Sequence, residues 1–397
     1  MQQTQKTLLQ FSIMLVIALC ILFFPTGNEK LVNGSNMNSY PGPGQGQNTN
    51  TANLIYSLRL PIIMNSPTPP KYSVSRYIYS NGYSYMHDTA GCAEGTSANP
   101  NAFVFLDFGN PWIDASTNPV TYGATLPGTI SNNLTISEIE QAVRYYIGGY
   151  YSCAPAGAYI RVAVGVTNFG NNNTVNGEHG KKWAEMILRL QNWVDTPPSY
   201  ADKVAVFGAI DIEPSWGVPN DAIGWEQGYD SINGRRAFYN FGTCDSCPYK
   251  YGNQDHTDWQ LPNSWDLDQI WYASYGPGSA RVFPEIYTRE DAPDILDVYF
   301  PAHEAYQWQY LKYWGATCTN CLPSYDPYKQ WRTINFSGSL TQYDACHDMG
   351  NPGASECQAI YGDNTPAQGW LSFWNALATD SVTKQNLDYS SDMTWKH

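Results

Sequence analysis

The sequence predicts an α/β fold, a (β/α)8 barrel of the TIM type, over residues 72–397. Two observations lead to this fold class. Apolar runs of strand length alternate with helical segments, and several runs are apolar at every position, as parallel strands covered on both faces are. About seven or eight such units in roughly 310 residues match a closed barrel. An open doubly wound sheet is the alternative, but no glycine-rich phosphate loop follows the early strands.

The expected strands are short apolar runs, most of which end in polar residues. A hairpin is expected around Asn81-Gly82, because two aromatic stretches flank a dipeptide that favours a tight turn. The remaining expected strands are residues 102–109, 158–168, 204–214, 237–244, 270–276, 280–288 and 333–342.

The expected helices have apolar residues at three- and four-residue spacing. In the segment TISEIEQAVRYYIGG, Ser137 and Glu140 have the spacing of a capping box, and Gly148-Gly149 marks the expected end of the helix. Further helices are expected at residues 177–194, 220–232, 302–315 and 365–379.

The chain begins with a segment typical of export. Leu8 to Phe24 is a largely apolar run within residues 1–26, which we interpret as a signal peptide or a signal anchor. Residues 27–71 are rich in Gly, Pro, Asn and Ser and almost uncharged, as flexible linkers are. We therefore expect a protein that is secreted or anchored on the outer side of the cytoplasmic membrane. Contact with the membrane is expected only through the first segment, if it stays uncleaved.

Cysteine usage agrees with an oxidising compartment, because eight cysteines besides Cys20 form an even set. CDSC and CTNC would each close a short loop, while Cys346 would pair with Cys357 and Cys92 with Cys153. A zinc site or a redox-active C-x-x-C is the alternative, but the two C-x-x-C pairs lie too far apart for a zinc ribbon and neither opens a helix after a strand. The expected disulfide cysteines are Cys92, Cys153, Cys244, Cys247, Cys318, Cys321, Cys346 and Cys357.

The composition limits the classes of molecule that the protein is expected to bind. The formal net charge of −14 argues against nucleic acids and anionic membrane surfaces. An aromatic content of 15% with only 14% charged residues fits a neutral, hydroxyl-rich partner such as a carbohydrate. The six histidines show no paired spacing for metal ligands, so neither a catalytic metal nor any other cofactor is expected.

The strand VAVFGAIDIEP carries the main catalytic candidates. Alternate residues from Val206 to Ile212 are apolar or glycine and are expected to face the helices. The other set therefore faces the lumen, and it ends in Asp211 and Glu213 at the mouth of the barrel, where active sites of this fold lie. Two carboxylates in a partly dry site cannot ionise equally easily, so the pKa of one should rise.

Other predicted strands also end in polar residues, and this convergence favours a site over isolated helix caps or turn residues. Asp107 and Glu285 are further catalytic candidates. A single tryptophan near a strand end is more often a core residue than a sugar platform. The candidate substrate-binding residues are Asn168, Asn240, Tyr287, Gln342, Trp112, Trp216 and Trp271.

These residues resemble the motifs of (β/α)8 glycoside hydrolases, without matching one family. Asp211 and Glu213 match the end of the Asp-x-x-Asp-x-Asp-x-Glu strand of family 18 chitinases, whose two earlier acids are absent here. Asp107 with the Asp-x-Glu pair resembles family 25 muramidases, which carry an Asp at the end of the first strand. Glu213-Pro214 also resembles the Asn-Glu-Pro motif of the large retaining clan, although Ile212 replaces the Asn.

The resemblance implies a role for each acid. Glu213 would be the general acid that protonates the leaving glycosidic oxygen. Asp211, helped by Asp107, would stabilise the developing positive charge or orient an N-acetyl group, and Glu285 would be the nucleophile if the enzyme uses one. We thus expect a glycosidase acting on a polysaccharide or cell-wall glycan. A non-catalytic carbohydrate-binding barrel and a structural protein of the cell envelope are the alternatives.

Overall fold

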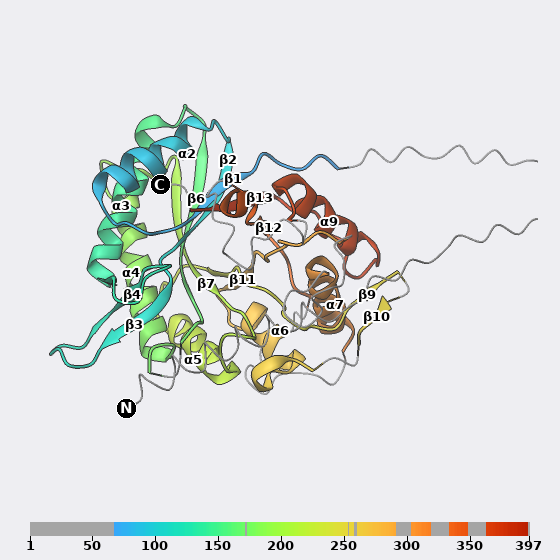
Figure 1. The fold of residues 1–397 in the computed structure, drawn as a ribbon. Helices are drawn as coiled ribbons and strands as arrows, with labels where there is room; N and C mark the ends of the chain where they lie inside the picture. The colour runs from blue at the N-terminus through green and yellow to red at the C-terminus, as the bar shows by residue number, and fades with distance from the viewer. Residues whose placement is uncertain are drawn as a thin grey trace, which may run out of the picture. The chain divides into compact units, whose positions relative to one another are not determined.

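Eight parallel strands form the central sheet in a computed structural model of the protein (Figure 1). They follow one another across the sheet in sequence order, and β13 pairs with β1. Parallel bridges from Val282 to Phe336 and from Glu285 to Leu340 join the two edges of the sheet. The strands are β1 (Ser73–Tyr77), β2 (Asn101–Asp107), β6 (Tyr159–Thr167), β7 (Val204–Asp211), β8 (Phe238–Asn240), β11 (Ala280–Val282), β12 (Gly338–Thr341) and β13 (Tyr389–Thr394).

The structure describes residues 67–170, 173–252, 254–257, 260–290, 303–318, 333–347 and 363–395. All of these belong to the unit Asn65–His397. The predicted export segment and nearly all of the predicted linker lie outside the described residues. Within the described residues, the α/β class and a curled parallel sheet are confirmed.

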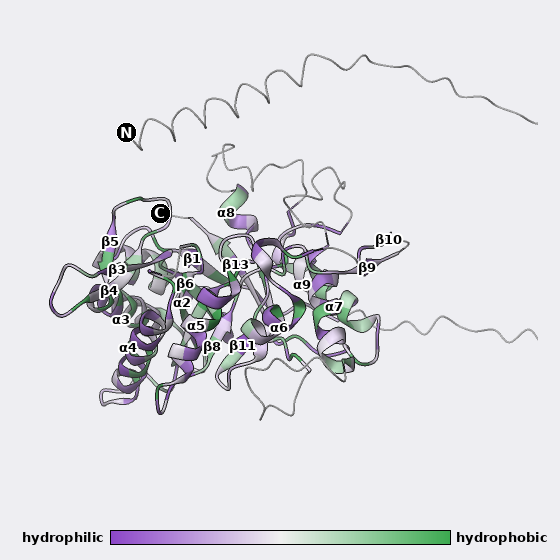
Figure 2. Cartoon of the chain, turned by 90° about the horizontal axis from the view of Figure 1, so that it is seen from below, coloured by the Kyte–Doolittle hydropathy of each residue, from purple (hydrophilic) through white to green (hydrophobic). Residues whose placement is uncertain are grey.

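Helices follow the strands and cover the outside of the sheet. Figure 1 shows α3, α4 and α5 beside one part of the sheet and α6, α7 and α9 beside the other. Many residues of α4 are hydrophilic (Figure 2), while most of its apolar residues are buried. The helices are η1 (Ser84–Cys92), α2 (Ala93–Thr96), α3 (Ile136–Cys153), α4 (Gly177–Asp195), α5 (Pro219–Asp230), η2 (Pro262–Ser264), α6 (Leu267–Tyr275), α7 (Glu304–Thr317), α8 (Tyr343–His347) and α9 (Pro366–Ala378).

Two small antiparallel sheets lie outside the main one. The three-stranded sheet is inserted between β2 and α3 and consists of β3 (Asn110–Asp114), β4 (Thr121–Thr125) and β5 (Asn133–Thr135). The two-stranded sheet follows β8 and consists of β9 (Lys250–Tyr251) and β10 (Gln254–Asp255).

The alternation of inward and outward side chains that was predicted for the strand carrying Asp211 is confirmed in β7. The side chains inside the curled sheet form one apolar cluster that includes Ala209, with Phe207 packed against it. Val206, Ile210 and Ile212 belong instead to the outer cluster between sheet and helices. The inner cluster also contains Phe103, Phe105, Ala163, Tyr239, Phe241, Phe283, Leu340 and Met393.

The predicted hairpin at Asn81-Gly82 is wrong. Strand β1 pairs in parallel with β2 and β13, which occupy both of its edges, and the segment after the turn forms η1. Helix η1 lies so close to α3 that a Cβ on Gly149 would meet the carbonyl oxygen of His87 at 2.0 Å. Gly149 therefore permits helix contact, and the Gly148-Gly149 pair does not end α3, which continues to Cys153.

Two other local predictions are also wrong. The capping box of α3 is formed by Thr135 and Glu138, two residues earlier than predicted, because Glu140 instead pairs with arginines. Residues 270–276 lie in α6 and not in a strand. Asp266 and Gln269 form a capping box that begins this helix, and its aromatic run fits a helical period as well as a strand period.

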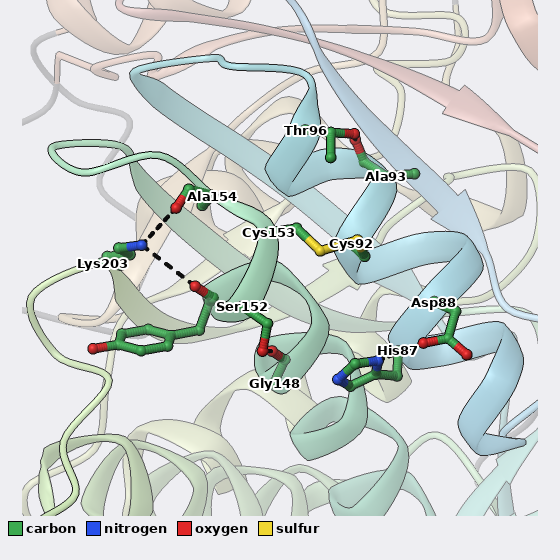
Figure 3. Close-up of a disulfide and its surroundings, with 11 residues drawn as sticks. His87, Asp88, Cys92, Ala93, Thr96, Gly148, Ser152, Cys153, Ala154 and Lys203 are labelled. Carbon is green, nitrogen blue, oxygen red and sulfur yellow. Dashed lines mark hydrogen bonds and ion pairs between the residues drawn. A yellow bond between two sulfur atoms is a disulfide. The ribbon is translucent and has the colours of Figure 1, made fainter.

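Disulfides are confirmed for the two pairs that lie wholly within the described residues. Cys92–Cys153 joins the end of η1 to the end of α3 (Figure 3), and Cys244–Cys247 closes a short loop after β8. Cys318 and Cys346 are disulfide-bonded as well, while Cys321 and Cys357 lie outside the described residues. None of the helices in the described ranges is long and apolar enough to cross a membrane.

Candidate active site

Three carboxylates converge at the carboxyl end of the main sheet. One oxygen from each of Asp211, Glu213 and Glu285 lies within 4.8 Å of the other two. Asp211 is the last residue of β7, and Glu213 follows it by two positions. Glu285 lies three residues beyond β11. The end of a parallel sheet thus brings together acids that are more than 70 positions apart in the sequence.

Two asparagines hold the turn that carries Glu213, and they lie at the ends of β6 and β8, the strands on either side of β7. The side-chain amide of Asn168 donates to the carbonyl of Glu213 at 2.9 Å, and its oxygen accepts from the Glu213 amide at 3.1 Å. Asn240 accepts from the amides of Ile212 and Gly242. Both predicted substrate-binding asparagines are buried and bonded to the backbone, so they position the acidic strand end.

Glu285 is placed by contacts on both sides. Its amide donates to the carbonyl of Gly242 at 3.1 Å, and the hydroxyl of Tyr287 donates to its carboxylate. A Cβ on Gly242 would lie 2.6 Å from Oδ1 of Asp211, so only glycine lets this backbone pass so close to the acids. Tyr287, predicted to bind substrate, therefore contacts a catalytic candidate directly.

Burial controls the ionisation of these acids. It raises the pKa of Asp107 to about 7, although this carboxylate accepts a hydrogen bond from the amide of Gly109. The pKa of Asp211 is raised well above its usual range by burial, with Asp107 and Asp245 adding to the effect. Burial and then Asp211 do the same for the pKa of Glu285. The cluster therefore retains protons at pH values where ordinary carboxyl groups are ionised.

Two buried oxygens of this cluster have no hydrogen-bond partner among the residues that the structure describes. These are Oδ1 of Asp211 and Oε2 of Glu285, in side chains that are 3% and 2% exposed. Buried polar atoms are nearly always satisfied in folded proteins, and exceptions are characteristic of functional sites. Three carboxylates this close could hold a divalent cation, or they could divide the roles of acid, base and nucleophile.

Aromatic side chains lie beside the acids in two pairs. Phe169 and Trp216 meet edge to face, with ring centroids 5.9 Å apart, and Phe169 is 53% exposed. Trp216 lies three residues after Glu213, and its amide donates to the Glu213 carbonyl. Tyr77 and Trp395 are stacked at 4.3 Å at the ends of β1 and β13.

The remaining sequence candidates lie on or beside other elements, namely α6, β3, β12 and β2. Trp271 is a core residue of α6, 3% exposed, so the proximity predicted from a strand end is wrong. Trp112 lies in β3 opposite Gly123. Gln342 follows β12, and its carbonyl accepts from the amide of Cys346. Asp107 ends β2, the second strand of the main sheet, whereas the muramidase resemblance has its Asp on the first.

The sequence prediction missed three residues of the site. Tyr77 ends β1, and its pKa is raised by burial and by the charges of Glu285, Asp211 and Asp107, which places its hydroxyl near the acids. Trp395 follows β13, whose polar sequence hid a strand. Asp245 lies inside the CDSC loop, a segment that was interpreted from its cysteines alone.

Comparison with known proteins adds little. No protein-family model and no curated protein matches the chain. Among solved structures, it is similar to a β-1,4-D-mannanase from Cryptopygus antarcticus, with 11% identity over 83% of this chain and 85% of that chain and a TM-score of 0.27. A TM-score this low carries no conclusion about function.

Proposed function

We propose that this protein is an extracytoplasmic glycoside hydrolase that cleaves a polysaccharide or cell-wall glycan by carboxylate catalysis. The observation that carries the proposal is the convergence of Asp211, Glu213 and Glu285 within 4.8 Å at the carboxyl end of a parallel sheet. Glycosidic bond cleavage requires two carboxyl groups on opposite sides of the bond, one protonated and one ionised.

The spacing supports a retaining mechanism with Glu213 and Glu285 as the working pair. Carboxyl groups about 5–5.5 Å apart favour retention, whereas inverting enzymes need about 6.5–9.5 Å to admit a water. Glu213 would give its proton to the leaving oxygen while Glu285 attacks the anomeric carbon and forms an ester. Glu213 would then take a proton from water, whose oxygen displaces Glu285 and restores both groups.

The surroundings fit these two roles. The hydroxyl of Tyr287 donates to Glu285 and would orient it for attack while stabilising its ionised form. Asp211 lies beside both glutamates and would stabilise the positive charge that develops on the sugar. Burial and mutual repulsion raise the pKa values of Asp211 and Glu285, so protonated and ionised carboxyl groups would lie side by side in the site.

The remaining architecture belongs to the same proposal. Residues 1–26 would export or anchor the chain, residues 27–71 would act as a spacer, and residues 72–397 would form a complete (β/α)8 barrel. The bridges that join the edges of the sheet support closure of the barrel. The disulfides support folding in an oxidising compartment.

A glycan panel tests the proposal. The wild type should release reducing ends from at least one polysaccharide, and NMR of the first product should show retained anomeric configuration. Glu213→Gln and Glu285→Gln should abolish release, while Glu185→Gln, which alters a surface ion pair with Lys182, should not. Equal activity in wild type and Glu213→Gln would contradict the acid assignment. Binding without cleavage by any variant would instead favour a carbohydrate-binding barrel.

A further inference from the structure

A fourth carboxylate, Asp245, lies beside the three catalytic candidates on a covalently closed loop. The disulfide between Cys244 and Cys247 forms a four-residue ring, and the amide of Cys247 donates to the carbonyl of Cys244 at 2.8 Å. Such a ring restricts the backbone on both sides of Asp245. The side chain is half-buried, unlike those of Asp211 and Glu285, so a ligand can reach it.

Hydrogen bonds connect this ring to the loop of Glu213. The hydroxyl of Ser215 donates to Oδ2 of Asp245 at 2.8 Å, and Ser215 lies two residues after Glu213. Asn263 donates to the carbonyls of Pro214 and Ser215, both at 2.8 Å, and holds the same loop from the other side. Asp245 therefore has a fixed position next to the proposed acid.

These carboxyl groups have no cationic partner within the described residues. No ion pair in that part of the chain includes Asp107, Asp211, Asp245 or Glu285. The charged groups that act on Glu285 are Asp211, Glu304 and Asp245, all of them acids. Ionising a buried carboxyl group is costly unless its charge is paired, so a ligand that brings positive charge would be favoured over a neutral one.

We propose that Asp245 is a specificity-determining residue that binds the protonated amine of a hexosamine, so that the favoured glycan carries free amino groups. The inference builds on the proposed glycosidase site and names its substrate class. A sugar ammonium group offers three donors and one positive charge to a carboxylate that already accepts from Ser215. Uronic acids and sulfated sugars would be repelled by the same group of acids.

Binding in the absence of turnover tests this inference. The full chain with Glu213→Gln would be titrated calorimetrically with three tetramers: β-1,4-glucosamine, its N-acetylated form and cellotetraose, at mildly acidic pH. We expect the amino tetramer to bind at least about tenfold more tightly than the other two, and the difference to shrink as salt is added. Equal binding of all three would overturn the inference.

Asp245→Asn in the same background separates recognition from support of the loop. It should remove the preference for the amino tetramer and leave binding of cellotetraose unchanged. Asp114→Asn, an exposed acid in β3, is the matched control and should keep the preference. A uniform loss of binding to all three sugars would mean that Asp245 only braces Ser215, and the inference would fail. Preferential binding of the amino tetramer without hydrolysis of any glycan by the wild type would contradict only the proposed catalysis.

Discussion

Two polar clusters in this protein both contain fully or almost fully buried side chains but differ in how their hydrogen bonds are satisfied. One surrounds His179, which is fully buried where β4, α4 and α5 meet. Its Nε2 donates to the carbonyl of Gly123 at 2.8 Å, and its Nδ1 accepts from the indole of Trp225 at 2.9 Å. The other cluster is the carboxylate group, in which Asp211 and Glu285 each retain an oxygen that forms no hydrogen bond with any described residue.

The difference separates a structural cluster from a functional one. Burial lowers the pKa of His179 to about 4, so the ring stays neutral and both nitrogens remain committed to the fold. Burial of the carboxylates is not balanced by internal hydrogen bonds, which costs stability and leaves atoms available to a ligand. Mutations in the two clusters should therefore have opposite effects on stability and activity.

The largest expected effect is on catalysis. Glu213→Gln keeps the shape of the side chain but removes the proposed proton donor, so kcat/KM should fall by about 10²–10⁴-fold. Because Glu213 is only half-buried, the free energy of unfolding should stay within about 0.5 kcal/mol of wild type. Steady-state kinetics and urea unfolding measure the two quantities. If Glu213→Gln lost both stability and activity, the proposed difference between the His179 cluster and the carboxylate cluster would be contradicted.

The second expectation concerns the structural cluster. His179→Ala leaves the indole of Trp225 and the carbonyl of Gly123 without a partner and opens a cavity, so unfolding should become easier by about 3 kcal/mol. The kcat of the folded fraction should not change. His87→Ala, at a partly exposed position, is the control and should cost much less. If fully folded His179→Ala had a lower kcat than wild type, the His179 cluster would also contribute to the active site.

The third expectation is a gain in stability, whereas His179→Ala is expected to lose stability. The raised pKa of Glu285 means that the folded state holds its proton more tightly than the unfolded state, so stability falls as pH rises above about 4.5. Glu285→Gln should therefore unfold less readily than wild type by about 1–2 kcal/mol at neutral pH, although it is inactive. Urea denaturation at pH 4 and at neutral pH measures the change. An equal stability difference at both pH values would show that ionisation is not the cause.

The smallest effect is expected at the exposed aromatic pair. Phe169→Ala removes one ring that meets Trp216 beside the proposed acid. KM should rise by roughly three- to tenfold with little change in kcat, because a stacking platform contributes about 1 kcal/mol to sugar binding. Initial-rate kinetics on the best polysaccharide of the panel measure both constants. Tyr83→Ala, an exposed aromatic in the segment before η1, should leave both constants unchanged.

Local sequence patterns were enough to predict the structure of segments in which burial alone decides it. In the strand from Val204 to Asp211, side chains alternate between two faces and only one of the alternate sets leads to acids, so its inner and outer faces and the inward direction of its acids followed from the sequence. The same reasoning failed at β13, whose sequence YSSDMT is polar because its side chains bond across the sheet. Oγ of Ser391, for instance, lies 2.7 Å from that of Ser75.

The sequence by itself determined the α/β class, the disulfides at Cys92–Cys153 and Cys244–Cys247, and the candidate acids Asp211, Glu213 and Glu285. Only the tertiary structure decided which of the acids meet, that Asn168 and Asn240 hold the backbone, and that Asp245 lies beside them. The reason is physical. Periodicity records which side of a strand is buried, whereas the distance between the ends of two strands depends on how the whole sheet curls and pairs.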